Sequence, residues 1–182
     1  MRSRHLSIEG DELHFHYRGK SGVEQDRTVA DRRLAQVVSE LDEAPGYRIF
    51  KYFDEDGERH WVQSDDLNEY IREVMGGDYS AKDFRTWAGT LIAALCLDEL
   101  GASTLEDIAQ KRIRSAVEEG ANRLGNTTAV ARSSYIAPQV LESYQQGITT
   151  CYFTRQIKRE LESPEELSVE ELGLLQLLKH KL

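Results

Sequence analysis

Cysteine and long apolar runs are both scarce in this chain of 182 residues. The two cysteines, Cys96 and Cys151, lie far apart in the sequence, which excludes a disulfide framework and a cysteine-based zinc cluster. The longest apolar stretch, around Leu91 to Leu97, is too short for a bilayer, and the amino terminus lacks a hydrophobic signal region. These absences predict a cytoplasmic protein without a membrane-spanning segment.

Motifs for nucleotide and metal cofactors are also missing. The run Gly19-Lys20-Ser21 suggests a phosphate-binding loop, but that motif requires a glycine at the position of His14 and a helix after the loop. Residues 23–29 instead alternate between apolar and polar side chains, as in a strand. The five histidines form no HxxxH or HExxH pattern. We therefore expect neither a metal nor a cofactor.

Basic residues are fewer than acidic ones, and the formal net charge is −9. This balance argues against nonspecific affinity for nucleic acid, which depends on clustered lysine and arginine. The acidic residues concentrate in residues 54–56, 118–119 and 162–171, so one face of the molecule can still be basic. The run Lys111-Arg112-Ile113-Arg114 fits either a solvated helix face or a face that contacts phosphates.

The remaining pattern is mostly helical, with a small β element near the front. Alternating residues over 12–18 and 23–29 flank a glycine-containing turn, which predicts a β-hairpin with Lys20 at its tip. A second short hairpin is expected over 47–53 and 59–62. Helical spacing and capping residues predict helices over 31–44, 64–75, 80–99, 104–120, 127–145 and 164–181. We expect a mainly α (α+β) fold that forms a single domain over residues 1–182.

One segment has the character of an active site. Gly125-Asn126-Thr127 predicts a turn and then a helix start, and Tyr135 follows Asn126 by nine positions (135 − 126). Asn126 can therefore present its side-chain N–H groups while Tyr135 emerges further along the helix. A tyrosine in this place is either a nucleophile or an ordinary core or rim residue.

Two further segments place cations beside this tyrosine in the order of the chain. The segment 80–90 begins a helix that continues into the apolar run at Leu91, so Arg85 is expected at the mouth of a buried helix. Lys20, at the tip of the first hairpin, can reach into a groove. A guanidinium suits charge stabilisation on a phosphate, and a lysine can protonate an alkoxide leaving group.

These segments resemble the catalytic domain of the type IB DNA topoisomerases, of the bacterial and poxvirus kind. The motifs are Tyr-Arg-Gly-Lys at 17–20, Lys-Asp-Phe-Arg at 82–85, and Gly-Asn-Thr at 125–127 with Tyr135 beyond it. The resemblance spans nearly the whole chain. It implies the helical fold of the type IB topoisomerase and tyrosine recombinase catalytic domains, and a monomer that relaxes supercoiled double-stranded DNA at the bacterial nucleoid without ATP or metal.

The resemblance also implies a role for each candidate residue. Tyr135 would attack a DNA phosphodiester, form a 3′-phosphotyrosyl bond and release a 5′-hydroxyl strand. Arg85 and Asn126 match the positions that hold the non-bridging phosphate oxygens, and Lys20 matches the general acid that protonates the leaving 5′ oxygen. Resealing would need no energy source, because the phosphotyrosyl link resembles in energy the bond that was broken.

The sequence departs from the family pattern in ways that bear on activity. Many members carry histidine where Asn126 stands, and an amide supplies a hydrogen bond without a positive charge. An earlier active-site arginine, in an Arg-Val/Ile-Gly segment ahead of the region that aligns with residues 2–6, has no match here. The amino-terminal β-rich clamp domain has no match either. We therefore expect a truncated catalytic domain, slowed on the order of a hundredfold or more unless an amino-terminal fragment supplies that arginine.

Two alternatives stay open at this stage. A tyrosine recombinase uses a related constellation, but recombinases usually place histidine three residues before the arginine, where this chain has Lys82. The other alternative is an inactive remnant that binds DNA or a protein partner. In each of the functions that involve DNA, Lys82 and Arg132 are candidate DNA-binding residues.

Overall fold

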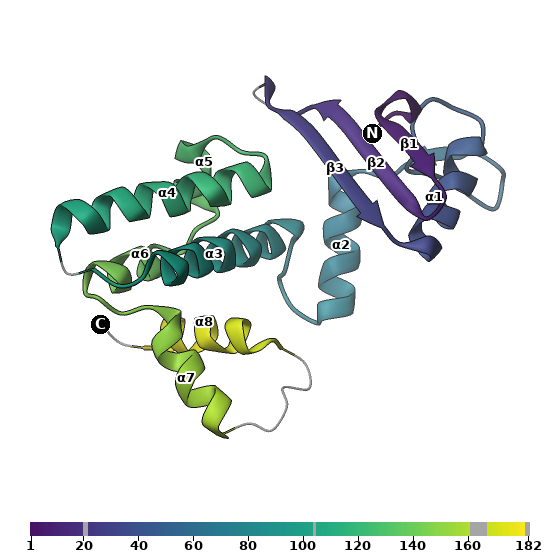
Figure 1. Ribbon diagram of the computed structural model, residues 1–182. Helices are drawn as coiled ribbons and strands as arrows, with labels where there is room; N and C mark the ends of the chain where they lie inside the picture. The colour runs from purple at the N-terminus through teal and green to yellow at the C-terminus, as the bar shows by residue number, and fades with distance from the viewer. Residues whose placement is uncertain (20–21, 104, 161–166, 181–182) are drawn as a thin grey trace. The chain divides into compact units, whose positions relative to one another are not determined.

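The computed structural model describes residues 1–19, 22–103, 105–160 and 167–180, and it forms two compact units, Met1–Ser80 and Ala81–Leu182. The first unit holds the β-strands, and the second is built from helices (Figure 1). The mainly α (α+β) class predicted from the sequence is confirmed. A single domain over residues 1–182 stays a prediction.

The amino-terminal unit combines short antiparallel strands with two α-helices. Its elements are η1 (Ser3–His5), β1 (Leu6–Glu9), β2 (Glu12–Arg18), β3 (Glu24–Ala30), α1 (Arg32–Glu43), β4 (Lys51–Phe53), β5 (Arg59–Trp61) and α2 (Ser64–Met75). The first three strands form one sheet in the order β1-β2-β3, and β4 pairs with β5. Both predicted hairpins are therefore confirmed, whereas β1 was not predicted.

The core of this unit follows from the alternation in β2. Leu13 and Phe15 lie two residues apart and share one face of the strand, and Leu13 is fully buried with Ala35 and Val38 of α1. At the turn end of the hairpin, the Gly19 N–H donates to the Val23 carbonyl at 2.8 Å. This contact closes the connection between β2 and β3. Lys20, which belongs to that connection, lies outside the described residues.

The carboxy-terminal unit is a packed set of helices. They are α3 (Ala81–Leu100), α4 (Glu106–Leu124), α5 (Thr128–Ser134), α6 (Pro138–Gln145), α7 (Thr150–Glu160) and α8 (Val169–Lys179). Helices α3 and α4 lie side by side (Figure 1). They approach each other closely at two glycines, where a Cβ added to Gly120 would lie 3.6 Å from the Gly89 carbonyl oxygen.

Buried side chains from all parts of this unit form one core. Leu97, Ile113, Val117, Tyr144 and Leu174 are each at most 2% exposed. The Tyr144 hydroxyl donates to the Gly101 carbonyl at 2.6 Å, and Arg112 Nη1 donates to the same oxygen at 2.9 Å. Arg112 therefore fastens the end of α3, which gives this member of the Lys111–Arg114 run a structural role.

Three helix predictions in this unit were wrong in extent. The helix expected over 127–145 is divided into α5 and α6, because Pro138 begins α6 and forces Ala137 into an extended conformation (φ −62°, ψ 122°). Helix α4 runs past Gly120 to Leu124, since that glycine lies in a helix crossing rather than at a stop. The helix expected over 164–181 is observed as α8, which starts after Ser168; the predicted start at Pro164 lies outside the described residues.

Helix α7 was not predicted, and its start is fixed by a carboxylate of α3. Asp98 accepts hydrogen bonds from the Thr150 hydroxyl and, at 3.1 Å, from the Cys151 backbone N–H. A carboxylate at a helix amino terminus satisfies N–H groups that lack partners inside the helix. Asp98 lies more than fifty positions earlier in the sequence, so local patterning could not reveal this cap.

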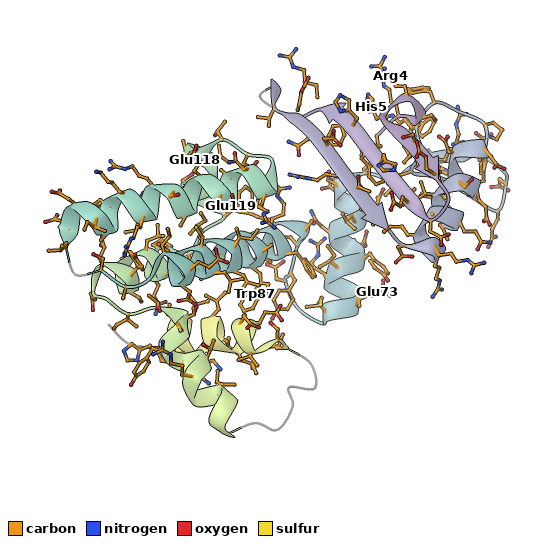
Figure 2. The ribbon with its side chains drawn as sticks, viewed as in Figure 1. Arg4, His5, Glu73, Trp87, Glu118 and Glu119 are labelled. Atoms are coloured by element: carbon orange, nitrogen blue, oxygen red, sulfur yellow. The ribbon has the colours of Figure 1, made fainter. Side chains whose placement is uncertain are left out.

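The carboxylate of Glu171 joins α8 to α3. It accepts from the backbone N–H and the hydroxyl of Ser168, both at 2.9 Å, and from Trp87 Nε1 at 3.3 Å. Figure 2 shows Trp87 between the two helices, and its ring packs against the core. The hydrogen bonds from Ser168, followed by the one from Trp87, lower the pKa of Glu171 below its ordinary value.

The lowered pKa of Glu171 predicts an acid-dependent loss of stability. The ionised form is stabilised in the folded state, so its contribution is present above the ordinary value of 4.5 and is lost as the pH falls through the folded-state pKa. We expect Glu171→Gln to lower the free energy of unfolding at neutral pH, and the difference from wild type to shrink in acid. Urea unfolding at a series of pH values measures this, with the exposed neighbour Glu170→Gln as control. A difference that stays constant with pH would contradict the prediction.

Candidate active site

The turn that carries Asn126 is built by the end of α4. Gly125 adopts a left-handed conformation (φ 65°, ψ 41°), which glycine enters without steric cost. The Asn126 N–H donates to the Ala121 carbonyl at 2.9 Å and the Gly125 N–H donates to the Asn122 carbonyl at 3.2 Å, the paired bonds of a Schellman motif. The predicted turn is confirmed, and its backbone is fixed on both sides of Asn126.

The next helix begins immediately after this turn. Thr127 is the N-cap of α5, and its hydroxyl accepts from the Val130 N–H at 3.4 Å. Asn126 is half-buried, and its side-chain nitrogen is shielded from solvent with no hydrogen-bond partner among the described residues. A buried amide donor without a partner is costly, so this arrangement calls for a ligand or a functional reason.

Tyr135 was expected on a helix, and this detail is wrong. It is the residue that ends α5, with φ −133° and ψ −2°, and its N–H donates to the Ala131 carbonyl. The chain leaves the helix here because Pro138, three residues on, cannot continue it. Tyr135 is half-buried, so its ring lies at the edge of the core rather than within it.

Arg85 connects the tyrosine to the turn at Asn126. Its Cζ lies 4.9 Å from the centroid of the Tyr135 ring, which is cation–π geometry. Its Nη2 donates at 3.1 Å to the carbonyl of Leu124, two residues before Asn126. Arg85 is exposed on the first turns of α3, as predicted for a residue at the mouth of a buried helix. The guanidinium therefore lies beside the tyrosine ring and at the carboxyl end of α4.

The structure gives fewer contacts for the other predicted site residues. Lys82 lies one turn before Arg85 on α3, Arg132 lies on α5 three residues before Tyr135, and both side chains are exposed. Lys20 lies outside the described residues and in the other unit. The structure thus brings together Arg85, Tyr135 and the Asn126 turn, and the two further cations lie on the same helices.

A hollow between α3 and α4 differs in character from this site. It has a volume of about 440 Å³ and is lined in part by Cys96, Glu99, Glu118 and Glu119. Burial raises the pKa of the Cys96 thiol, and the carboxylates of Glu99 and Glu119 add to the effect. Such a thiol stays protonated at neutral pH and is a poor nucleophile. The acidic lining also makes this hollow unsuited to a phosphate backbone.

The structure holds no ready metal site in the part of the chain that it describes. No group of three or more histidine, cysteine, aspartate or glutamate side chains converges there. Across the same residues, every helix is too short or too polar to span a lipid bilayer.

Sequence reasoning missed the residues that hold the backbone around Tyr135. They are Thr86, Gly89 and Thr90, on the α3 face that meets this segment. The available signal was a glycine in the middle of a predicted helix, which often marks a close approach of another backbone. Neither threonine carries a local pattern that distinguishes it from an ordinary helix residue.

Comparison with known proteins identifies the family of this chain. Residues 1–162 match the family described as eukaryotic DNA topoisomerase I, catalytic core. A DNA topoisomerase 1B from Acanthamoeba polyphaga mimivirus is 34% identical over 153 residues, which cover 80% of this chain and 45% of the viral protein. The class of protein is thus that of the topoisomerase I catalytic cores.

The chain belongs to the type IB DNA topoisomerase family, as the motifs around Lys20, Arg85 and Tyr135 predicted. It spans a little under half the length of the viral relative. The roles of its individual residues stay predictions.

Gly125 offers a test of how the turn places Asn126. An alanine there would be held in a left-handed conformation, so Gly125→Ala should destabilise the protein by about 1 kcal/mol. Gly101 ends α3 with a similar φ of 76° and open space around it, so Gly101→Ala is a matched control for the same strain. We expect urea unfolding to show similar losses of stability in both variants. Cleavage of a labelled DNA duplex should fall only in Gly125→Ala. Equal function in the two variants would contradict a role for the turn.

Proposed function

We propose that this chain is an enzyme that relaxes supercoiled double-stranded DNA by cutting and resealing one strand. Tyr135 Oη attacks the phosphorus of a phosphodiester and loses its proton to solvent. A 3′-phosphotyrosyl bond forms as the bond to the 5′ oxygen breaks, and that oxygen takes a proton from Lys20. The cut strand rotates, and the 5′-hydroxyl then attacks the phosphotyrosyl bond to restore the DNA. Neither ATP nor a metal ion is required.

The observation that carries this proposal is the position of Arg85, 4.9 Å from the Tyr135 ring centroid and hydrogen-bonded at the turn before Asn126. A phosphate attacked by the phenol would lie within reach of this guanidinium. Charge grows on the non-bridging oxygens in the transition state, and a fixed donor there lowers the barrier by roughly 3 to 4 kcal/mol. Arginine suits the task because its donors form a planar fork.

Asn126 is proposed as the second donor to the same oxygens. Its side-chain nitrogen has no hydrogen-bond partner among the described residues, and a small rotation would turn it toward a bound phosphate. The fixed backbone of the Gly125 turn limits the cost of this rotation, because only side-chain torsions change. The amide adds a hydrogen bond without a full positive charge, so Arg85 carries most of the electrostatic stabilisation.

Strand cleavage also requires contacts to the DNA backbone and the earlier active-site arginine of the family pattern, for which this sequence has no match. Lys82 and Arg132 are exposed on α3 and α5, and we propose that they contact backbone phosphates beside the cleaved bond. We further propose that full activity requires the arginine of an amino-terminal segment or partner fragment. The enzyme would act as a monomer on cytoplasmic, nucleoid DNA.

Replacing the nucleophile gives the first test. The purified chain is incubated with labelled suicide duplexes and supercoiled plasmid, without ATP or metal, and analysed for an SDS-stable adduct and for relaxation. Tyr135→Phe should abolish the adduct while leaving the unfolding transition close to that of wild type, since only a hydroxyl is removed. Tyr152→Phe, an exposed tyrosine on α7, is the matched control and should keep the adduct.

The outcomes separate the candidate functions. An adduct that persists in Tyr135→Phe would overturn the assignment of the nucleophile. A wild-type chain that binds the duplex but forms no adduct would favour the DNA-binding remnant over the enzyme. Strand exchange between two cleaved duplexes would favour a recombinase.

The role of Lys20 has its own chemical signature. Lys20→Ala should slow cleavage of an ordinary phosphodiester, by roughly the hundredfold or more that general acid catalysis contributes. A 5′-bridging phosphorothiolate has a leaving group that needs no proton, so this substrate should be cleaved at nearly the wild-type rate. Single-turnover rates on the two substrates make the comparison, and an absence of rescue would argue against the acid role.

A further inference from the structure

The segment around Tyr135 is held by its backbone rather than by its side chain. Thr90 is 2% exposed, and its hydroxyl donates to the Tyr135 carbonyl at 3.4 Å. The hydroxyl oxygen of Thr90 also accepts a hydrogen bond from the Ala137 N–H at 3.0 Å. One hydroxyl therefore bridges the residues on either side of Ile136, in a stretch that belongs to neither α5 nor α6. Without it, two backbone groups at the helix break would lose partners.

Gly89 allows this contact to form. A Cβ added to Gly89 would lie 2.6 Å from the Tyr135 carbonyl oxygen and 2.8 Å from Leu124 Cδ1. Real Cβ atoms do not approach backbone oxygens this closely, so any side chain at Gly89 must move the Tyr135 backbone away from α3. The carbonyl of Tyr135 thus lies directly against the helix backbone.

A third contact lies one turn earlier. The Thr86 hydroxyl lies 3.4 Å from the Ser134 carbonyl and 3.0 Å from the Lys82 carbonyl. It has one hydrogen to share between them, so this contact is weaker than the bridge made by Thr90. Together the two threonines and the glycine line one side of α3 where Ser134 to Ala137 crosses it.

The same helix also carries Arg85. Residues 85, 86, 89 and 90 fall within two turns of α3, so the phosphate-binding cation and the backbone contacts of the tyrosine share one rigid element. The distance from Arg85 to the Tyr135 ring is then set by how closely Tyr135 approaches Gly89. In proximity catalysis, an error of about 1 Å in such a distance can cost on the order of a hundredfold in rate.

We propose that Gly89 and Thr90 are positioning residues, which fix the backbone of the nucleophile at the distance from Arg85 that strand cleavage requires. The inference rests on the proposed function of Tyr135. Neither residue touches the DNA in this proposal, so changing them should slow the cleavage step while leaving DNA affinity unaltered.

Two glycines on the crossing helices provide a matched pair for the test. Gly89→Ala would press on the Tyr135 backbone, whereas an alanine at Gly120 would meet Ile136 Cδ1 at 3.3 Å, the end of a flexible side chain. Single-turnover cleavage of a suicide duplex at saturating enzyme, and duplex affinity, are measured for both. We expect Gly89→Ala to cleave on the order of a hundredfold more slowly with unchanged affinity. Gly120→Ala should stay within a few-fold of wild type.

Thr90 gives a second test in case Gly89→Ala fails to fold. Thr90→Val removes the bridging hydroxyl and should slow cleavage about tenfold, as expected for the loss of hydrogen bonds to a positioned group. Thr90→Ser keeps the hydroxyl and should restore most of the rate. Thr150→Val removes another buried hydroxyl of the same unit, one that is bonded to Asp98 rather than to the segment around Tyr135, and controls for lost stability. Hydrogen exchange of the Ala137 amide, measured without DNA, should accelerate in Thr90→Val and not in Thr150→Val.

Each outcome bears on a separate claim. Wild-type cleavage rates in Gly89→Ala and Thr90→Val would overturn the positioning role and leave Tyr135 as the nucleophile. Equal slowing in Thr90→Val and Thr150→Val would also overturn it, because general destabilisation would explain both. A wild-type chain that forms no adduct would overturn the proposed function itself, whatever the exchange of the Ala137 amide.

Discussion

The close crossing of α3 and α4 is the constraint on which the site depends. Two glycines let the helices approach until a Cβ at Gly120 would contact the Gly89 carbonyl oxygen at 3.6 Å. This approach brings the end of α4, with the Asn126 turn, to the first turns of α3. The space beside Gly89 is filled by the Tyr135 carbonyl and the Leu124 side chain, which would lie 2.6 Å and 2.8 Å from an added Cβ. The Asn126 amide, the Arg85 guanidinium and the Tyr135 phenol are thus all positioned by α3, although they come from two separate stretches of the sequence.

The charged and hydrogen-bonding groups of this site are held in place before any substrate binds. Arg85 is held by the Leu124 carbonyl, and the Asn126 turn is held by a Schellman motif, so neither group must be reorganised from a distant position. Preorganised donors are effective because little free energy is spent in orienting them during the reaction. Asn126 retains a donor without a partner among the described residues, and that unmet hydrogen bond is the feature most directly suited to an incoming anion. The net charge of −9 makes such local concentration of donors more important than any general attraction to DNA.

Sequence reasoning reached the local elements and missed what depended on distant contacts. The hairpins, the helix that carries Arg85 and the turn at Gly125 follow from alternation, capping residues and left-handed glycine, which are all local effects. The division of 127–145 at Pro138 was missed although its cause is local, because proline disfavours helix in the residue before it. By contrast, the cap that Asp98 gives to α7 and the bridge that Thr90 makes to Tyr135 join residues more than forty positions apart. For the site, motifs identified the reactive side chains, and the packing of α3 decided how they are held.

Attachment through the backbone has a mechanical consequence for the covalent intermediate of the proposed reaction. While the 3′ end of the cut strand is joined to Tyr135, the segment that carries the 5′-hydroxyl rotates, and the joined end must stay in place for resealing. Helix α5 has only seven residues, so it alone gives that end little support. The bridge from Thr90 and the contact with Gly89 attach it to α3, a helix of twenty residues that contributes Ala93, Ala94 and Leu97 to the hydrophobic core. The phenol side chain can still rotate about its own bonds, so the phosphotyrosyl linkage joins the DNA to a fixed backbone through a side chain that can rotate.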